Sequence, residues 1–303
     1  MNIEKKLVQA RQAYTSEQFE KAEKLLTQIL LEAPDEPEVY SLRAMTFLSL
    51  GEVERTVMDL TMAISLAPEE VNYYGQRGNV FMMVNQFKLA LADWSSIIRL
   101  DVHNTDAYLS RAVCYTALND FKHALADTNT AIRLAPQDGN GYHVRAGIYF
   151  DKNQFADCVA DCNKAIELGY KDMLVYSTRG EAYANLKEYD KALADYDEAI
   201  RLEPTDLDNY DLRARVFSAQ GDDARALAEY DALVTQYPDM IDSYMIRAFF
   251  HLGNNAYAKA LADIDRALAI EPDNRIILEA RKNVMAEMRG NDIKKLMKRK
   301  KHK

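Results

Sequence analysis

The most constraining feature of this chain is a 34-residue period that runs through nearly all of its 303 residues. Six of the seven prolines are 34 residues apart or twice that distance, and a tyrosine series keeps the same spacing. The prolines are Pro34, Pro68, Pro136, Pro204, Pro238 and Pro272. The tyrosines are Tyr40, Tyr74, Tyr108, Tyr142, Tyr176, Tyr210 and Tyr244. Such a period indicates an array of stacked units, each packed on its neighbours, rather than one large core.

Each unit has the pattern of two amphipathic helices. In the unit that Pro204 closes, Tyr176, Gly180 and Tyr183 are spaced i, i+4, i+7 and therefore share one helical face. A second such face runs through residues 189–200. Pro204 then stops the second helix, because its ring lacks an N–H and clashes with the preceding turn. The small residues on the first face allow the two helices to approach closely.

The turn between the two helices has its own signature. Six of the units place glycine or asparagine there, and these residues tolerate the left-handed conformation that ends a helix. They are Gly51, Asn85, Asn119, Asn153, Gly221 and Asn255. Lys187 occupies the same slot in another unit, where we expect some backbone strain.

These features resemble the tetratricopeptide repeat, a 34-residue helix pair with an early aromatic, small residues at the helix crossing and a closing proline. The family's first-helix tryptophan is replaced by tyrosine or is absent, and Trp94 lies in a second helix. The resemblance implies an all-α, right-handed α-solenoid superhelix. It predicts eight repeats at 3–36, 37–70, 71–104, 105–138, 139–172, 173–206, 207–240 and 241–274. A capping helix at 275–290 and a basic tail at 291–303 would follow.

A series of charges accompanies the period. Arginine precedes the small residue of each first helix from repeat two onward, and an acid recurs in each second helix. The arginines are Arg43, Arg77, Arg111, Arg145, Arg179, Arg213 and Arg247, and the acids are Asp59, Asp93, Asp127, Asp161, Asp195, Glu229 and Asp263. Two pairings are open: Arg43 with Asp59 within a repeat, or Arg77 with Asp59 between repeats. The first leaves Arg281 alone and the second leaves Arg43 alone. We predict a mostly buried ladder that sets the register of the helices, rather than a charged binding strip.

The sequence contains no motif for catalysis, a cofactor or a metal. It lacks the P-loop, the dinucleotide-binding glycine pattern, the HExxH pair and the GxSxG nucleophile turn, and its histidines are scattered. Cys158 and Cys162 are four residues apart, but they occupy packing positions and have no further ligands nearby in sequence. We therefore predict a protein that is not an enzyme and has no catalytic residues, cofactor or metal.

The family resemblance implies that first helices line a concave groove, with groove positions at the second, fifth, ninth, twelfth and thirteenth residues of each repeat. These positions give a mixed lining: repeats two to four and eight offer several apolar residues, and repeats five to seven are more polar and include Glu181. Flexible methionines beside leucine and valine suit an apolar helix or extended peptide. Our candidate partner-binding residues are Met45, Leu48, Asn79, Met82, Met83, Leu109, Val113, His143 and Phe249. Some of them could instead pack against a neighbouring repeat.

Two binding modes known in the family do not match these positions. Chaperone-binding members grip a C-terminal carboxylate with lysine, asparagine and arginine, whereas no lysine or arginine stands at the fifth position of any repeat here. We therefore exclude a chaperone-type carboxylate clamp. The asparagine ladder of the sugar-transferase relatives is also missing.

The C-terminal end has the opposite charge from the rest of the chain. The last ten residues carry seven Lys or Arg and no acid, which leaves 31 basic against 47 acidic residues, a net charge of −16. Candidate tail contacts are Lys294, Lys295, Lys298, Arg299, Lys300 and Lys301. The run could be a disordered solubilising end, a phosphate-binding segment for RNA, a ribosome or an anionic surface, or a segment that folds back on the acidic body.

These observations predict a protein–protein interaction scaffold that binds a peptide or helix in its groove. The alternative is an RNA- or ribosome-associated factor that uses the basic tail, and nucleic acid would bind only there. No segment approaches the roughly 20 apolar residues of a membrane span. The N-terminal residues lack the apolar segment of a secretory signal, and the three cysteines are few, so we expect a cytoplasmic protein.

Overall fold

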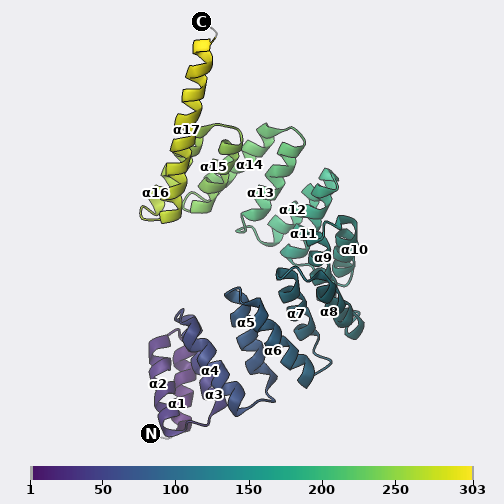
Figure 1. Ribbon diagram of the computed structural model, residues 1–303, viewed down its shortest axis with the longest axis vertical. Helices are drawn as coiled ribbons and strands as arrows, with labels where there is room; N and C mark the ends of the chain where they lie inside the picture. Colours follow the sequence, from purple (N-terminus) through teal and green to yellow (C-terminus); the bar gives the residue numbers. More distant parts are fainter. Residues whose placement is uncertain (1–2, 302–303) are drawn as a thin grey trace. The chain divides into compact units, whose positions relative to one another are not determined.

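The computed structural model describes the backbone of residues 3–301 and the side chains of residues 3–290, and it is all-α (Figure 1). Within that range the chain forms helices joined by short turns and contains no strand. Odd-numbered helices up to α15 are here called A-helices, and even-numbered ones B-helices. From α1 and α2 to α7 and α8, and from α11 and α12 to α15 and α16, each A-helix packs against the B-helix that follows it. The all-α solenoid prediction is confirmed.

The chain divides into two compact units, and the helix α10 (Phe155–Glu167) contributes residues to both. Unit 1 holds residues 1–154 and 163–170, and unit 2 holds residues 155–162 and 171–303. The other helices of unit 1 are α1 (Ile3–Thr15), α2 (Phe19–Glu32), α3 (Pro37–Ser49), α4 (Val53–Leu66), α5 (Val71–Met83), α6 (Phe87–Leu100), α7 (Thr105–Ala117), α8 (Phe121–Leu134) and α9 (Gly139–Asp151). Those of unit 2 are α11 (Met173–Asn185), α12 (Tyr189–Leu202), α13 (Asp208–Ala219), α14 (Asp223–Gln236), α15 (Ile241–Gly253), α16 (Tyr257–Ile270) and α17 (Arg275–Lys301).

Left-handed residues end the A-helices, as the turn signature predicts. All six predicted glycines and asparagines have positive φ, from 57° to 83°. Lys187 adopts the same conformation, with φ 63°, and so does Glu17 in repeat one, with φ 57°. A side chain with a Cβ is disfavoured in this conformation, so these two turns carry backbone strain.

Prolines end the B-helices through the residue that precedes them. Ala67, before Pro68, has φ −136° and ψ 74°, outside the helical region that a following proline disfavours. Helix α10 has Tyr170 in place of that proline and ends differently. Gly169 turns the chain with φ 92°, and the Tyr170 amide donates to the Ala165 carbonyl. This glycine-based stop ends α10 one residue before the corresponding end of α4.

The tyrosine series has a polar role as well as a packing role. The hydroxyl of Tyr74 donates to the carbonyl of Pro68 at 3.1 Å, and Tyr244 makes the same bond to Pro238 at 3.1 Å. The ring fills the space beside the small residue, and the hydroxyl satisfies a carbonyl that a terminated helix leaves unpaired. Phenylalanine could fill the space but could not supply this bond.

The arginine ladder is largely buried and pairs within each repeat. In six repeats the arginine Nε and Nη2 donate to both carboxylate oxygens of its own B-helix acid, at 2.5–3.2 Å. These pairs are Arg43–Asp59, Arg77–Asp93, Arg111–Asp127, Arg179–Asp195, Arg213–Glu229 and Arg247–Asp263. The prediction of burial is confirmed, and the structure selects the first of the two pairings.

The same arginines also reach the preceding repeat. The Nη1 of Arg111 donates to Ser95 at 3.1 Å, and that of Arg247 donates to Asp231 at 2.7 Å. The acceptor is two residues beyond the acid of the earlier B-helix, and Arg281 binds its equivalent there, Asp265. Each such guanidinium therefore links its own hairpin to the preceding one. Arg281 was expected to be alone under this pairing, and that expectation is wrong.

The last helix is longer than the sequence pattern indicated. We expected it to end at Gly290, but α17 continues to Lys301 and does not form a disordered end there. One glycine costs only about 1 kcal/mol in a helix, and the lysines, leucine and methionine that follow favour helix. The candidate tail contacts 294–301 lie on this extension, and their side chains are outside the described residues.

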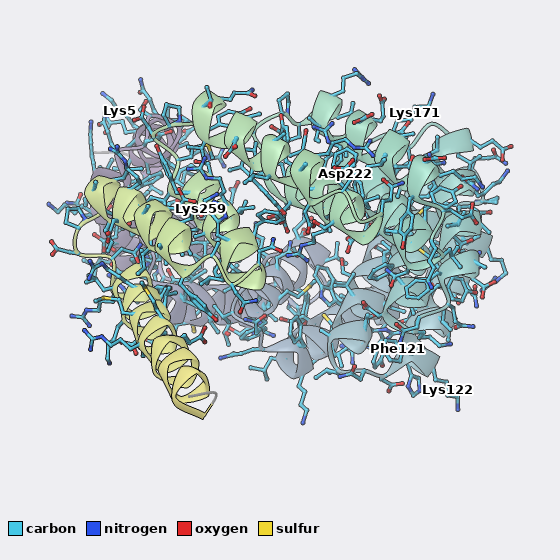
Figure 2. All side chains as sticks on the ribbon, turned by 90° about the horizontal axis from the view of Figure 1, so that it is seen from above. Lys5, Phe121, Lys122, Lys171, Asp222 and Lys259 are labelled. Atoms are coloured by element: carbon cyan, nitrogen blue, oxygen red, sulfur yellow. The ribbon has the colours of Figure 1, made fainter. Side chains whose placement is uncertain are left out.

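Charged side chains cover the outside of both units. The lysines labelled in Figure 2, Lys5, Lys122, Lys171 and Lys259, are exposed and point away from the helices. Along the described part of the chain, no helix is both long and apolar enough to cross a membrane.

Candidate functional site

The A-helices of unit 1 enclose a surface hollow of about 750 Å³. Three successive A-helices, α3, α5 and α7, form its sides, and α6 forms its floor. The lining residues are Glu38, Ser41, Glu70, Val71, Asn72, Tyr73, Gly75, Gln76, Asn79, Trp94, Ile97, Asn104, Asp106 and Ala107. We call this surface the α3–α5–α7 hollow. A hollow of this size matches the range of about 300–1,000 Å³ that is typical of ligand sites.

A tryptophan packs against the backbone of α5 at the floor of the hollow. A Cβ at Gly78 would lie 3.0 Å from Trp94 Cε2, and a Cβ at Gly75 would meet Trp94 and Ile97 at 3.8 Å. Because α5 has no side chain at either place, the indole of Trp94 lies against its backbone. Trp94 itself is buried. Of the two glycines, Gly75 lines the hollow.

The rim of the hollow is acidic. Glu38, Glu70 and Asp106 line it, and no lysine or arginine does. Burial raises the pKa of Tyr73, and the nearby carboxylates of Glu70 and Glu38 raise it further. Glu38 also forms an ion pair with Arg11 of α1. The arrangement favours a partner that is neutral or positively charged at this place.

The candidate residues differ widely in exposure. Met83 is 57% exposed and Val113 is 39% exposed, and both are large apolar side chains that the fold leaves in water. Asn79 is exposed and lines the hollow. In unit 2, Phe249 is 61% exposed on α15. These four side chains are available to a partner.

The other candidates are partly or wholly used in packing. Leu109 is only 4% exposed, which leaves little of its side chain for partner contacts. Met82 and Leu48 are half-buried and pack on core clusters of unit 1. Met45 is also half-buried. His143 stacks on Tyr170 with ring centroids 5.2 Å apart.

Sequence reasoning missed much of the hollow's lining. Val71, Asn72 and Tyr73 stand at the first three positions of their repeat, and only the second of these was counted as a groove position. Glu70 precedes α5, and Glu38 lies in the first turn of α3. Gly75 was the available signal, because it is a groove position without a side chain.

The described side chains do not form a metal or nucleophilic centre. No group of three or more His, Cys, Asp or Glu among them could hold a metal ion. Cys114, Cys158 and Cys162 are free and buried, and burial raises the pKa of the Cys114 thiol to about 11. The Cys114 thiol is therefore protonated at neutral pH. Buried free cysteines act as small apolar residues.

Three sequence models described as tetratricopeptide repeat match the chain, at residues 105–138, 174–206 and 212–275. No curated protein is significantly similar to it in sequence.

Many solved structures share the fold. A tetratricopeptide repeat protein from Parabacteroides merdae is 21% identical with a TM-score of 0.62, over 82% of this chain and 98% of that one. The C-terminal part of a TPR repeat-containing protein from Cytophaga hutchinsonii is 17% identical with a TM-score of 0.53, over 90% and 98%. The Cut9–Hcn1 hetero-tetramer of the APC/C gives 16% identity and a TM-score of 0.58, over 92% of this chain and 55% of that one. At these identities the likeness concerns the fold.

Proposed function

Because the chain is a tetratricopeptide repeat protein, we propose that it is a non-catalytic scaffold that holds partner proteins through peptide or helical segments laid along its A-helices. The observation that carries this proposal is the α3–α5–α7 hollow, about 750 Å³ in volume and lined by three successive A-helices. An extended segment that crosses those helices would touch a new repeat every few residues.

The surroundings of the hollow suit a protein segment. Met83 and Val113 offer exposed apolar surface on α5 and α7, and methionine adapts its shape to different partners. Asn72 and Asn79 offer amide groups that can bind a peptide backbone. Apolar contacts with a few polar anchors are the usual composition of a peptide-binding surface.

A cytoplasmic location suits this scaffold, because the three cysteines of the chain are free thiols. The Cut9–Hcn1 hetero-tetramer is a solved assembly that contains a chain of similar fold. Both observations support the proposal.

Selection of peptides on the full chain tests the proposal. A displayed library of random peptides is selected on the protein, and binding is measured for two variants, Asn79→Trp in the hollow and Met83→Glu one turn further along α5. We expect each variant to weaken the selected peptides by about tenfold or more, the usual effect of losing a central contact.

Met58→Glu is the matched control. Met58 is 68% exposed on the B-helix α4, so the same substitution places the same charge on a comparably exposed methionine outside the hollow. We expect it to leave peptide binding unchanged. The proposal is overturned if no peptide is selected. It is also overturned if Asn79→Trp and Met83→Glu both bind the selected peptides as tightly as the control does.

A further inference from the structure

We infer that unit 2 carries a pocket for the side chain of a lysine or arginine of the bound segment, with Glu181 of α11 as the group that receives its positive charge. The inference rests on the proposed function, because it names the chemistry of one contact that the partner makes. No sequence motif pointed to this pocket, although Glu181 occupies the ninth position of its repeat, one of the expected groove positions.

The pocket lies among α11, α12 and α13 and has a volume of about 240 Å³. Most of its wall is apolar or aromatic: Ala184, Tyr189, Tyr196, Leu212, Val216 and Ala219. It is smaller than the 300 Å³ or so at which pockets for drug-sized ligands begin, so it suits a single long side chain. The wall can cover the aliphatic stem of lysine or arginine, whose charged end needs a polar partner.

The carboxylate of Glu181 is half-buried and has no hydrogen-bonding partner among the described residues. It forms no hydrogen bond or ion pair with any described residue, although its neighbours on α12 and α13 include several polar groups. Burial raises its pKa, which shows that the ionised form loses water here without a sufficient protein partner. A cation from outside would restore the lost interaction.

Arg215 is the one cation at the pocket, and another acid holds it. Its Nη2 lies 2.7 Å from Asp211 Oδ2, and the arginine side chain is 70% exposed. Asp211 also accepts a hydrogen bond from the buried Tyr230 hydroxyl at 2.8 Å, so it is firmly placed. Arg215 lowers the pKa of Glu181, whereas Asp208 raises it. Counting Glu181, Asp208 and Asp211 against Arg215 leaves a net charge of −2 around the pocket.

A basic side chain can contact both the apolar wall of this pocket and the Glu181 carboxylate, whereas acidic and apolar side chains cannot do both. An acidic side chain would meet excess negative charge. A purely apolar side chain would cover the Glu181 carboxylate and leave it without water or a partner, which is costly for an ionised group. The pocket therefore discriminates against apolar and acidic residues as well as favouring basic ones.

A double-mutant cycle tests the inference on the full chain. Peptides with one fixed central lysine and random flanks are selected on the protein, and each is also made with norleucine, which keeps the stem and removes the charge. We expect norleucine to weaken binding by roughly tenfold or more on the wild-type chain, which matches the loss of a charge-assisted bond. On Glu181→Gln we expect lysine and norleucine peptides to bind alike.

Glu198→Gln is the control, because it removes the same charge from the exposed side of α12 and does not line the pocket. It should retain the full preference for lysine. Peptides that bind but show the same lysine preference with and without the Glu181 carboxylate overturn the inference and leave the proposed function standing. Failure to select any peptide overturns the proposed function and this inference with it.

Discussion

At two places a glycine of an A-helix lies directly against an aromatic ring of the B-helix that follows. A Cβ at Gly180 would lie 2.8 Å from Tyr196, and one at Gly78 would lie 3.0 Å from Trp94. In repeat two the same place holds Ala44, and the facing residue is the smaller Leu60. In repeat seven the two places hold Ala214 and Tyr230, which share one core cluster. The two glycines therefore allow a closer approach of the ring and are not required by a turn or an unusual φ.

Replacing Gly180 tests this complementarity. We expect Gly180→Ala to destabilise the protein by about 1–2 kcal/mol, because overpacking costs about 1–3 kcal/mol and outweighs the better helix propensity of alanine. Gly147→Ala is the control: it also lies within an A-helix, and its Cβ would meet nothing within 4 Å. We expect that variant to be stabilised by up to about 1 kcal/mol. Thermal unfolding measures both, and shifts of the same sign would contradict the packing argument.

The half-buried carboxyl group of Glu181 should make the free energy of unfolding depend on pH. Its folded pKa is raised by burial, so the folded protein binds protons more readily than the unfolded chain. The resulting destabilisation is fully present above the folded pKa and disappears as pH falls below the unfolded value, about 4.3. We expect Glu181→Gln to raise the unfolding midpoint near neutral pH and to lose that advantage by about pH 4. An equal effect at both pH values would show that the ionised carboxylate carries no such cost.

At the scale of the elements, an arginine joins consecutive hairpins through hydrogen bonds to both. Arg111 donates through Nε and Nη2 to Asp127 of its own repeat and through Nη1 to Ser95 of the preceding one. Its ring neighbours Tyr108 and Tyr115 lie 5.7 and 5.9 Å from the guanidinium carbon and shield these bonds from water. Lysine carries the same charge but cannot make three bonds in this fixed plane.

We expect Arg111→Lys to destabilise the protein by about 2 kcal/mol, because it breaks a largely buried, two-bond ion pair. Arg201→Lys is the control. Arg201 binds Glu198 with two bonds at 2.7 Å but is 65% exposed, so its replacement should destabilise the protein clearly less than that of Arg111. Chemical denaturation gives both values, and similar losses would show that burial does not govern the strength of the ladder.

The last helix completes the core of the hairpin before it. Ile277 and Val284 of α17 are buried with Ala260, Ile264 and Ala267 of α16. Ending the chain at residue 274 removes both side chains from this cluster. We expect a loss of about 3 kcal/mol or more, because each buried aliphatic side chain contributes about 1.5–3 kcal/mol.

A chain that ends at Gly290 keeps this cluster intact, and we expect its stability to match that of the full chain. Comparison of the two truncations by thermal unfolding separates the capping role of α17 from the basic extension beyond it. Equal losses in the two truncated chains would place the stabilising contacts in residues 291–303 instead.

At the scale of the whole molecule, two compact units should respond separately to local damage. Stability in a stacked array depends mainly on each repeat and its nearest neighbours. Trp94 is the only tryptophan and is buried in unit 1, so its fluorescence reports that unit alone. Circular dichroism reports the helices of both units.

We expect Gly180→Ala, in unit 2, to lower the midpoint by circular dichroism more than the midpoint by Trp94 fluorescence. Gly78→Ala, which crowds Trp94 in unit 1, should shift the fluorescence transition most. Coincident transitions for both probes in both variants would show instead that the chain unfolds as one cooperative body.

The features that recur every 34 residues could be predicted from the sequence, because they depend on the conformational preferences of residues within one hairpin. A residue such as Asn85 ends its helix in a left-handed conformation in any setting, and Pro68 drives the residue before it out of the helix. Likewise, a charged residue beside a buried stripe requires a partner, so the burial of the arginine ladder was predictable. Its acceptors were not, because two acids lay within equivalent reach of each arginine.

The functional surfaces depend on the space between hairpins, which no single repeat determines. Leu109 is buried, whereas Met83, at another groove position, is exposed, because different neighbours cover them. The α3–α5–α7 hollow is lined by residues from these three helices and from α6. At the Glu181 pocket, Arg215 forms its ion pair with Asp211. Periodicity and local chemistry therefore determined the elements of this protein, and the shapes of side chains from three helices at a time decided where a partner can bind.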